Sequence, residues 1–397
     1  MKICVLSSRF PFPENGGDAL RINNIARYLK SKNHSLILIS FYNGDIKLKK
    51  EYFELYDEIH TIRHLKIFAL IFSVLAVLCG KPIQCGYYFS PMFSYWVKKT
   101  KQQVSPDIYI AHLLRTTSYV DNDQMRRKVI VEMTDALSRT YALSNQAESI
   151  NIKKYIYKIE KNLIRRYEKK VIWHFPKIVL VSQNDIDLLK SQNHISGENL
   201  VCHTNGVKCK ASVKTDCNGN KIGFVGNMRT LQNQEAVFFF VREIFPLIKC
   251  KCPDSVFTII GAEPPKKIKS LSDGKNIVVT GFVEDLESEI ADCSVSVAPV
   301  RIAAGIQNKV LFSMACGIPT VMTSLIAKSI PGLITGENCI IADTSQEIAD
   351  AVIRIMQDAE FREHLSKEGY NTIKQDYSWN KVLEGYEEIS FNTGVRT

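Results

Sequence analysis

The sequence contains no CxxC pair, although it has 11 cysteines among its 397 residues. Cysteine ligands of structural zinc usually come in pairs with two or more residues between them, and the tightest spacing here, Cys250 and Cys252, does not fit. No signal-peptide pattern precedes the strand-like residues that begin at Lys2, so we expect reduced thiols and a cytoplasmic protein. The cysteines therefore favour neither a disulfide framework nor a metal site.

The sequence also lacks an apolar run long enough to cross a bilayer. Residues 67–79, IFALIFSVLAVLC, carry no charge, but as a helix they would span about 20 Å, against about 30 Å for the hydrocarbon core. Two interpretations remain open for this stretch. It is either a helix buried in the core or an interfacial helix that enters one leaflet, helped by Lys66, Lys81 and the aromatic residues nearby.

Acidic residues are scarce in the first half of the chain. Residues 1–190 carry 30 Lys and Arg against 17 Asp and Glu, whereas the remainder carries 21 against 24. A basic half indicates an anionic partner, such as a membrane surface, a phosphorylated acceptor or nucleic acid. The densest basic cluster, residues 153–170, has the charge spacing of a solvated helix in which Glu160 and Glu168 dilute the positive charge. It matches no nucleic-acid reader motif, so we expect no nucleic acid.

Short apolar runs rich in β-branched residues alternate with helical segments along the chain, which indicates parallel βαβ units. The expected strands of the first half are residues 2–8, 35–40, 107–112, 128–133 and 178–182. The five of the second half are residues 222–227, 256–261, 276–281, 293–300 and 318–323. The pattern predicts an α/β protein of two doubly wound Rossmann-like domains facing across a cleft. We expect one domain over 1–200, a second over 201–376, and a C-terminal helix, 377–397, that crosses back to the first.

The stretch RIAAGIQNKVLFSMACGIPTV, residues 301–321, follows an expected strand and begins a helix near Gln307. Backbone N–H groups at a helix start favour an anion, and small residues allow it to approach closely. Lys309 in the first turn opposes the helix dipole unless an anion is present. We therefore interpret the stretch as a diphosphate site, with a capped helix and a surface lysine as the alternative. Glycines follow strands in the same way at Gly226 and at Gly16–Gly17.

Together these elements resemble the retaining glycosyltransferases of the GT-B fold, of the family-four (group 1) type. The matching segments of the first half are FPENGGDALR, AHLLR, VEMTDALS and RRYEKKV. Those of the second half are NGV, FVGNM, VVTGFVED, SVAPVRIAAGIQNKVLFSMACGIPTV and DYSW. They cover nearly the whole chain in the family's order.

The resemblance implies which residues act. The nucleotide-sugar donor is expected in the C-terminal domain, with the acceptor on the N-terminal one. The residues expected to bind the donor are Gly16, Gly17, Gly226, Asn227, Arg229, Gly281, Phe282, Val283, Arg301, Gly305, Gln307, Asn308 and Lys309. His112 and Asp135 match positions near the reacting sugar, and Arg115 would hold the acceptor or orient His112. A satisfied histidine at a strand end and a helix cap are the alternatives for His112 and Asp135.

The implied reaction moves a hexose from a UDP- or GDP-sugar to a glycan or lipid-linked acceptor, with retention at the anomeric carbon. It would serve the synthesis of cell-surface polysaccharide: lipopolysaccharide, capsule or exopolysaccharide. We expect no metal and no other cofactor, because Lys309, Arg229 and helix N-termini can neutralise the departing diphosphate. The basic N-terminal domain would bind the inner face of the cytoplasmic membrane peripherally.

One position departs from the family pattern. Its two glutamates, eight positions apart, fall at Ala304 and Phe312, and the second normally hydrogen-bonds the donor ribose. Losing that charged hydrogen bond costs about 1.5–3 kcal/mol. Phe312 therefore keeps two other functions open: a catalytically weakened partner subunit of this fold and, with less support, a nucleotide-sugar epimerase.

Overall fold

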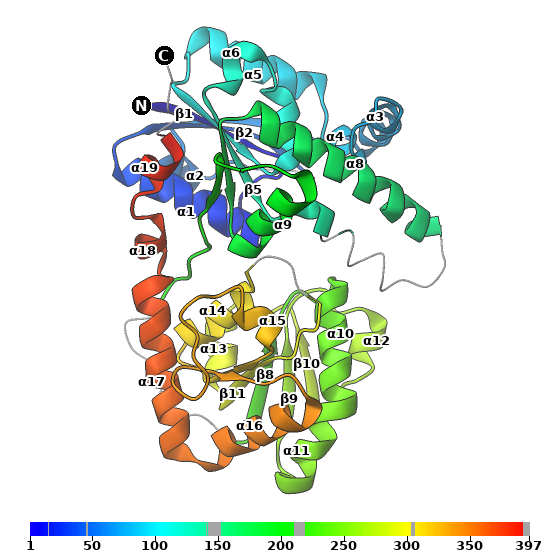
Figure 1. Cartoon of the computed structure of the whole chain (residues 1–397), viewed down its shortest axis with the longest axis vertical. Coiled ribbons are helices and arrows are strands. Elements are labelled where there is room, and N and C mark those ends of the chain that lie inside the picture. Colours follow the sequence, from blue (N-terminus) through cyan, green and yellow to red (C-terminus); the bar gives the residue numbers. More distant parts are fainter. Residues whose placement is uncertain are drawn as a thin grey trace. The chain divides into compact units, whose positions relative to one another are not determined.

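The computed structural model describes residues 1–14, 16–44, 47–139, 141, 152–209, 219–302 and 306–391. The chain divides into two compact units (Figure 1). Unit 1 comprises Met1–Thr204 together with Leu383–Thr397, and unit 2 comprises Asn205–Val382. The sequence placed these changes at residues 200 and 377, whereas the units change after Thr204 and Val382.

Unit 1 contains a seven-stranded parallel sheet with the strand order β3-β2-β1-β4-β5-β6-β7. Its strands are β1 (Lys2–Ser7), β2 (Ser35–Tyr42), β3 (Glu58–Arg63), β4 (Ile108–His112), β5 (Val129–Thr134), β6 (Lys177–Leu180) and β7 (Leu200–Cys202). The sequence predicted five of them. The two that it missed are the edge strands, and β3 has one buried residue and β7 is only three residues long.

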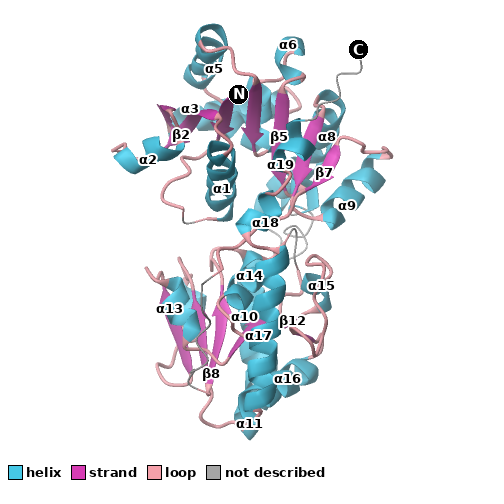
Figure 2. Cartoon of the chain, turned by 90° about the vertical axis from the view of Figure 1, so that its left-hand side faces the viewer, coloured by secondary structure: helices cyan, strands magenta, loops and turns pink. Residues whose placement is uncertain are grey.

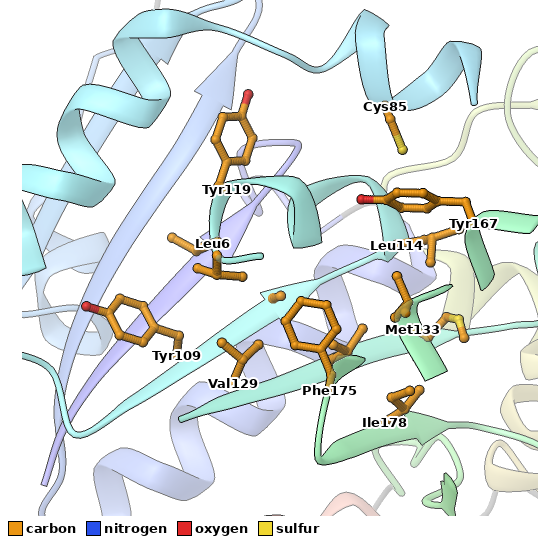
Figure 3. Packing of buried hydrophobic residues seen from close by; sticks show 14 of the residues in the cluster. Leu6, Cys85, Tyr109, Leu114, Tyr119, Val129, Met133, Tyr167, Phe175 and Ile178 are labelled. Atoms are coloured by element: carbon orange, nitrogen blue, oxygen red, sulfur yellow. The ribbon is translucent and has the colours of Figure 1, made fainter. Parts of the chain in front are cut away.

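Residues along the central strands alternate between the two faces of this sheet, as the pleat requires. Cys4 and Leu6 of β1 belong to one apolar cluster, which also contains Phe175 and Ile178 (Figure 3). Figure 2 shows helices on both sides of the strands, so the core consists of two layers. The buried runs in the sequence therefore reflect a sheet covered on both faces.

The helices of unit 1 are α1 (Gly17–Ser31), α2 (Lys50–Leu55), α3 (Lys66–Leu78), α4 (Ile83–Tyr87), α5 (Pro91–Gln103), the 3₁₀ helix η1 (Leu114–Tyr119), α6 (Asp123–Arg126), α8 (Ile152–His174), α9 (Gln183–Asn193) and α19 (Tyr386–Phe391). The prediction of a solvated helix over 153–170 was wrong for its two glutamates. Glu160 and Glu168 on α8 are both buried. Each accepts backbone hydrogen bonds from another segment: Glu160 from Ile83 and Glu168 from Ser138.

The apolar stretch 67–79 forms α3, and it is not a core helix. Most of its large side chains are exposed, including Ile67 at 74% and Leu78 at 77%. Only Ala69, Ser73 and Ala76 are buried. The interpretation as a buried helix was therefore wrong. No helix among the described residues has the length and apolar character needed to cross a bilayer.

Unit 2 contains a second parallel sheet, of six strands in the order β10-β9-β8-β11-β12-β13. Its strands are β8 (Lys221–Val225), β9 (Val256–Ile260), β10 (Ile277–Gly281), β11 (Val295–Ala298), β12 (Thr320–Met322) and β13 (Ile340–Ile341). The sequence predicted the first five. The sixth has only two residues at the sheet edge, too few to show a pattern.

The helices of unit 2 are α10 (Leu231–Phe239), the π-helical turn η2 (Phe240–Ile244), α11 (Phe245–Lys251), α12 (Lys266–Lys269), α13 (Leu286–Ala291), α14 (Asn308–Ala315), α15 (Ser324–Ala327), α16 (Ser345–Gln357), α17 (Ala359–Asp376) and α18 (Trp379–Leu383), whose last residue already belongs to unit 1. The helical segment that begins with α10 changes to a π turn before Pro246, which has no N–H to continue the ladder. The expected C-terminal helix, 377–397, is interrupted at Gly385, which has φ of +75°.

Both sheets reverse their strand order once, unit 1 between β1 and β4 and unit 2 between β8 and β11. In doubly wound sheets, ligands bind beyond the carboxyl ends of the strands at such a switch point. The switch point of each unit is therefore the expected place for its site.

Candidate functional site

In unit 1 the switch point brings Ser7 and His112 together, because they are register partners at the ends of β1 and β4. Ser7 Oγ and His112 Nδ1 lie 3.4 Å apart. The side chain of His112 is almost fully buried, and its Nε2 atom has no hydrogen-bond partner among the described residues. His112 therefore offers one unused ring nitrogen at the strand end.

Burial lowers the pKa of His112 to about 3, and the nearby Arg115 and Arg21 guanidinium groups act in the same direction. The imidazole is therefore neutral at physiological pH. A neutral imidazole donates one hydrogen bond and accepts one. Toward a sugar hydroxyl it can do either, but it cannot neutralise a departing phosphate.

Arg115 in η1 lies beside His112 and is held by two contacts. Its Nε donates to Ser8 Oγ at 2.6 Å, and its guanidinium lies 4.4 Å from the centroid of the Tyr88 ring. Arg9 Nε donates to Tyr88 Oη at 3.2 Å. The sequence did not single out Ser7, Ser8 or Arg9, although a polar triplet directly after β1 was a usable signal. The residues at the end of β1 thus contact both predicted side chains: Ser7 contacts His112, and Ser8 contacts Arg115.

Asp135 follows β5, and burial together with the nearby Asp185 raises its pKa to about 6. Asp185 on α9 is fully buried and pairs with Arg139, 3.0 Å from its Nη1. Asp185 lies in the first turn of α9, where an acidic residue suits the helix dipole. The charge of Asp135 is therefore sensitive to pH near neutrality.

A cavity of about 480 Å³ opens beyond the carboxyl ends of β1 and β2, within the range typical of ligand sites. Its wall is rich in rings: Phe10, Phe12, Phe41, Tyr42, Tyr52, His64 and Tyr88. Arg9 and Lys47 supply positive charge to it. Tyr88 also contacts Arg115, so the cavity adjoins the Arg115 side chain.

Gly16 and Gly17 lie at the start of α1, where Gly16 is extended with φ of −149°. Gly16 has no side chain to cap the helix, and Asp18 in the first turn forms an ion pair with Arg9 at 3.6 Å. An anion at this helix start would therefore meet a carboxylate as well as backbone N–H groups. The predicted role of these glycines stays a prediction.

In unit 2, Gly226 and Asn227 follow β8 at the switch point. A Cβ on Gly226 would lie 2.7 Å from Asn233 Nδ2, and one on Gly261 would lie 1.9 Å from the Gly226 carbonyl oxygen. Asn233 Nδ2 donates to the Asn227 carbonyl oxygen at 2.8 Å. Gly226 and Gly261 thus allow the backbone after β8 to contact the backbone after β9, and we call this contact the glycine crossing. The side chain of Asn233 on α10 packs against it.

Lys309, in the first turn of α14, extends toward this crossing. Its Nζ donates to Asn233 Oδ1 and lies 5.0 Å from the centroid of the Phe224 ring. Among the described residues no carboxylate pairs with it, and burial lowers its pKa to about 7. A lysine held in this state favours an anion, because an anion restores the charged form. Lys309 is half-buried and the Gln307 side chain does not cap α14, so these contacts favour the diphosphate site, which stays a prediction.

The residues around Lys309 belong to the same loop. Gln307 is the residue before α14 and is buried, and its side chain does not cap the helix. Asn308 Oδ1 accepts from Asn205 Nδ2 at 3.1 Å. Gly305 and Ala304 lie outside the described residues. The first turn of α14 therefore carries one amide side chain and one lysine.

The two predicted arginines already have carboxylate partners. Arg229 Nε pairs with Glu263, and Arg301 pairs with Glu235 while its guanidinium lies 4.0 Å from the centroid of the Phe239 ring. Either arginine would have to give up or share its partner to bind a phosphate. Lys309 is the predicted cation without that competition.

The predicted base-binding residues follow β10. Gly281 has φ of +74°, and its carbonyl oxygen accepts from Gly261 N at 3.1 Å. Phe282 is 63% exposed, whereas Val283 packs against an apolar cluster. Phe312 is partly buried against the same cluster, which contains Val225 and Ile260. The position where the family has a glutamate is therefore an apolar wall.

Among the described residues, no group of three or more His, Cys, Asp or Glu side chains could hold a metal ion. Any charge on a bound diphosphate would meet the lysine and the N-terminus of α14. The absence of a required cofactor stays a prediction.

The chain is similar in sequence to known proteins. Residues 219–358 match the family model for glycosyl transferases group 1. An uncharacterized 44.6 kDa protein in the cps region of Klebsiella pneumoniae is 24% identical over 393 residues, which cover 96% of this chain and 98% of that protein.

Solved structures share the fold at low identity. Anabaena HepE in complex with UDP has a TM-score of 0.67 at 13% identity, with 98% of this chain and 99% of HepE covered. WaaG, a glycosyltransferase involved in lipopolysaccharide biosynthesis, has a TM-score of 0.64 at 11% identity, with 98% and 99% covered. The chain thus has the GT-B fold of these glycosyltransferases, and its residues 219–358 match the family model for glycosyl transferases group 1.

Proposed function

We propose that the protein is a retaining glycosyltransferase, with a nucleotide-diphosphate sugar bound by unit 2 and the acceptor bound by unit 1. The observation that carries the proposal is Lys309. It is a lysine without a carboxylate partner among the described residues, in the first turn of α14 and beside the glycine crossing after β8. Helix N-terminus, lysine and close-packed backbone together form an anion site.

The donor is a hexose linked to UDP or GDP. Lys309 and the N-terminus of α14 hold the diphosphate and stabilise the negative charge that grows as it leaves. The bond from the anomeric carbon to the phosphate oxygen breaks, and the acceptor oxygen bonds to that carbon from the same face. The acceptor proton passes to the leaving phosphate oxygen. Neither a protein nucleophile nor a metal takes part in this scheme.

The acceptor is a glycan, free or lipid-linked, of cell-surface polysaccharide. The ring-lined cavity of unit 1 supports this proposal, because aromatic faces pack against the apolar faces of sugar rings. The His112 Nε2 atom, buried and without a hydrogen-bond partner among the described residues, supports a hydrogen bond to a sugar hydroxyl of the acceptor, and Arg115 positions the acceptor or His112. The cps-region relative and WaaG support the polysaccharide assignment. The transfer would then take place at the inner face of the cytoplasmic membrane.

Calorimetric titration of UDP, GDP and their sugar conjugates tests the donor site. We expect one nucleotide series to bind, and Lys309→Met to weaken it by about 10- to 100-fold, since a charge-assisted hydrogen bond contributes about 1.5–3 kcal/mol. Lys221→Met is the matched control, because Lys221 begins β8 at the opposite edge of the sheet and pairs with Glu289. Equal affinities for wild type and Lys309→Met would refute the assignment. Proton NMR of the product reports whether configuration is retained.

Phe312 favours a second candidate, a partner subunit of this fold without its own turnover. Its packing against the apolar cluster leaves no acceptor for a ribose hydroxyl at that position. This candidate predicts that the folded wild type binds no nucleotide in the same titration.

A further inference from the structure

Helix α3 presents its large apolar side chains outward. The exposed residues are Ile67, Phe68, Leu70, Ile71, Val74, Leu75 and Leu78. They recur with helical spacing, so they form one continuous face along the helix rather than scattered contacts. A contiguous apolar face of this kind marks an interaction surface.

The opposite face of α3 fixes the helix to unit 1. Its buried residues are the small Ala69, Ser73 and Ala76, and a Cβ on Gly86 of α4 would lie 2.2 Å from the Phe72 carbonyl oxygen. Glu160 of α8 accepts from the backbone N–H groups of Ile83 at 2.6 Å and Gln84 at 3.2 Å. The α3–α4 hairpin is therefore held in place by packing and hydrogen bonds, and its outward face is a defined part of the fold. Figure 1 shows it at the rim of unit 1.

The charges around this face have one sign. Residues 59–106 contain six Lys and Arg and no Asp or Glu. Lys66 is the first residue of α3, and Lys81 follows its end. Met92 and Tyr95 on α5 add exposed side chains suited to an interface. The surface is thus apolar in the middle and basic at both ends.

We propose that the exposed face of the α3–α4 hairpin docks on an anionic lipid surface, with α3 lying in the plane of the headgroups. An apolar helix face that enters the acyl boundary, combined with flanking lysines on acidic headgroups, supplies the two signals that stable peripheral binding requires. A second copy of the chain is the poorer occupant, because a symmetric contact would bring two carboxylate-free basic segments together. The proposal names the surface for the membrane association inferred above, and does not depend on donor binding by unit 2.

Flotation of the full chain with vesicles tests the proposal, using phosphatidylcholine alone and with phosphatidylglycerol added. We expect binding only to the anionic vesicles, reduced by high salt. Ile71→Glu should lower the partition coefficient at least about tenfold, because it replaces an inserted apolar side chain by a charge. Ile334→Glu in unit 2 is the matched control, since both isoleucines are 50% exposed. Lys66→Glu with Lys81→Glu should remove the dependence on phosphatidylglycerol.

Equal flotation of wild type and Ile71→Glu would overturn the proposal. So would a wild-type dimer, seen by sedimentation velocity without lipid, that Ile71→Glu dissociates. Nucleotide titration of the same variants separates this result from the proposed function. Unchanged nucleotide affinity with lost flotation supports the docking surface, whereas a folding defect would alter both readouts.

Discussion

Protonation of the Lys309 amine should be coupled to the binding of the nucleotide. In the free protein, burial lowers its pKa to about 7, so above pH 7 the amine is mostly neutral. A bound diphosphate favours the ammonium form and raises the pKa again. The protein should therefore take up as much as about one proton on binding at pH 8 and less at pH 6.

The same linkage sets the direction of the pH dependence. Nucleotide affinity should fall as pH rises above 7, approaching about tenfold per pH unit while the bound lysine stays charged. Calorimetry in two buffers of different ionisation enthalpy measures the proton uptake directly. Lys309→Met should show no buffer dependence at all. An observed enthalpy that is the same in both buffers for wild type at pH 8 would contradict the assignment.

Phe312 can be tested by restoring the missing carboxylate. Phe312→Glu should strengthen nucleotide binding about 10- to 100-fold if the glutamate reaches the ribose, because a charged hydrogen bond contributes about 1.5–3 kcal/mol. It should also lower the stability of the free protein, since Phe312 packs against an apolar cluster that includes Val225 and Ile260. Phe312→Leu, which keeps the wall apolar, is the control. Weaker nucleotide binding by the glutamate variant would mean that the phenylalanine itself contacts the donor.

For single residues, the sequence predicted where a side chain lies in the fold better than it predicted which side chain it contacts. Residues directly after strands, such as His112 and Gly226, could be chosen because parallel strands end at one edge of the sheet. The pairing of Arg301 with Glu235 could not, because it depends on where α10 lies relative to the residues that follow β11. The apolar surroundings of Phe312 were hidden for the same reason.

Among the elements, the α3–α4 hairpin depends on a single glycine. Gly86→Ala gains about 1 kcal/mol of helix propensity. The new Cβ would nevertheless lie 2.2 Å from a backbone oxygen of α3, which cannot move without separating the two helices. We expect a net loss of about 1–3 kcal/mol in the free energy of unfolding, measured by chemical denaturation. Gly219→Ala, where a Cβ has no neighbour within 4 Å, should change the stability by less than about 0.5 kcal/mol.

The elements were predicted where their periodicity was strong. The central strands β1, β4, β8 and β11 have buried runs that identify them, whereas the edge strands are short or half exposed. The exposure of α3 could not be read from its sequence, because a helix that is apolar all round suits a core and an interface equally. The burial of Glu160 could not be predicted, because it depends on where the N-terminus of α4 lies in the folded protein.

For the whole molecule, the decisive feature is that unit 1 is built from both ends of the chain. Tyr386 Oη donates to Glu132 Oε1 at 2.5 Å, and Arg21 Nε donates to the other oxygen of that carboxylate at 2.9 Å. All three side chains are fully buried. The end of the chain thus satisfies a buried charge in the centre of the first sheet.

Tyr386→Phe should therefore lower the stability of unit 1 by about 1–3 kcal/mol, because it leaves a buried carboxylate oxygen without its donor. Urea unfolding followed by hydrogen exchange at β5 amides measures the loss in that unit. Tyr377→Phe is the control in unit 2, where the hydroxyl donates to the neutral Pro331 carbonyl oxygen at 2.7 Å. Its cost should be about 0.5–1.5 kcal/mol. Equal effects at both positions would show that the buried charge is not what makes Tyr386 important.

The discontinuity of unit 1 also has a consequence for how the protein is made. The ribosome synthesises residues 1–204 long before Tyr386 leaves the exit tunnel. The Arg21–Glu132 pair therefore lacks the Tyr386 hydrogen bond until all of unit 2 has been synthesised. The nascent first sheet stays incomplete during that interval, while unit 2 is continuous in sequence and can fold as it emerges. Maturation of residues 1–204 is thus completed by a segment that is synthesised after unit 2.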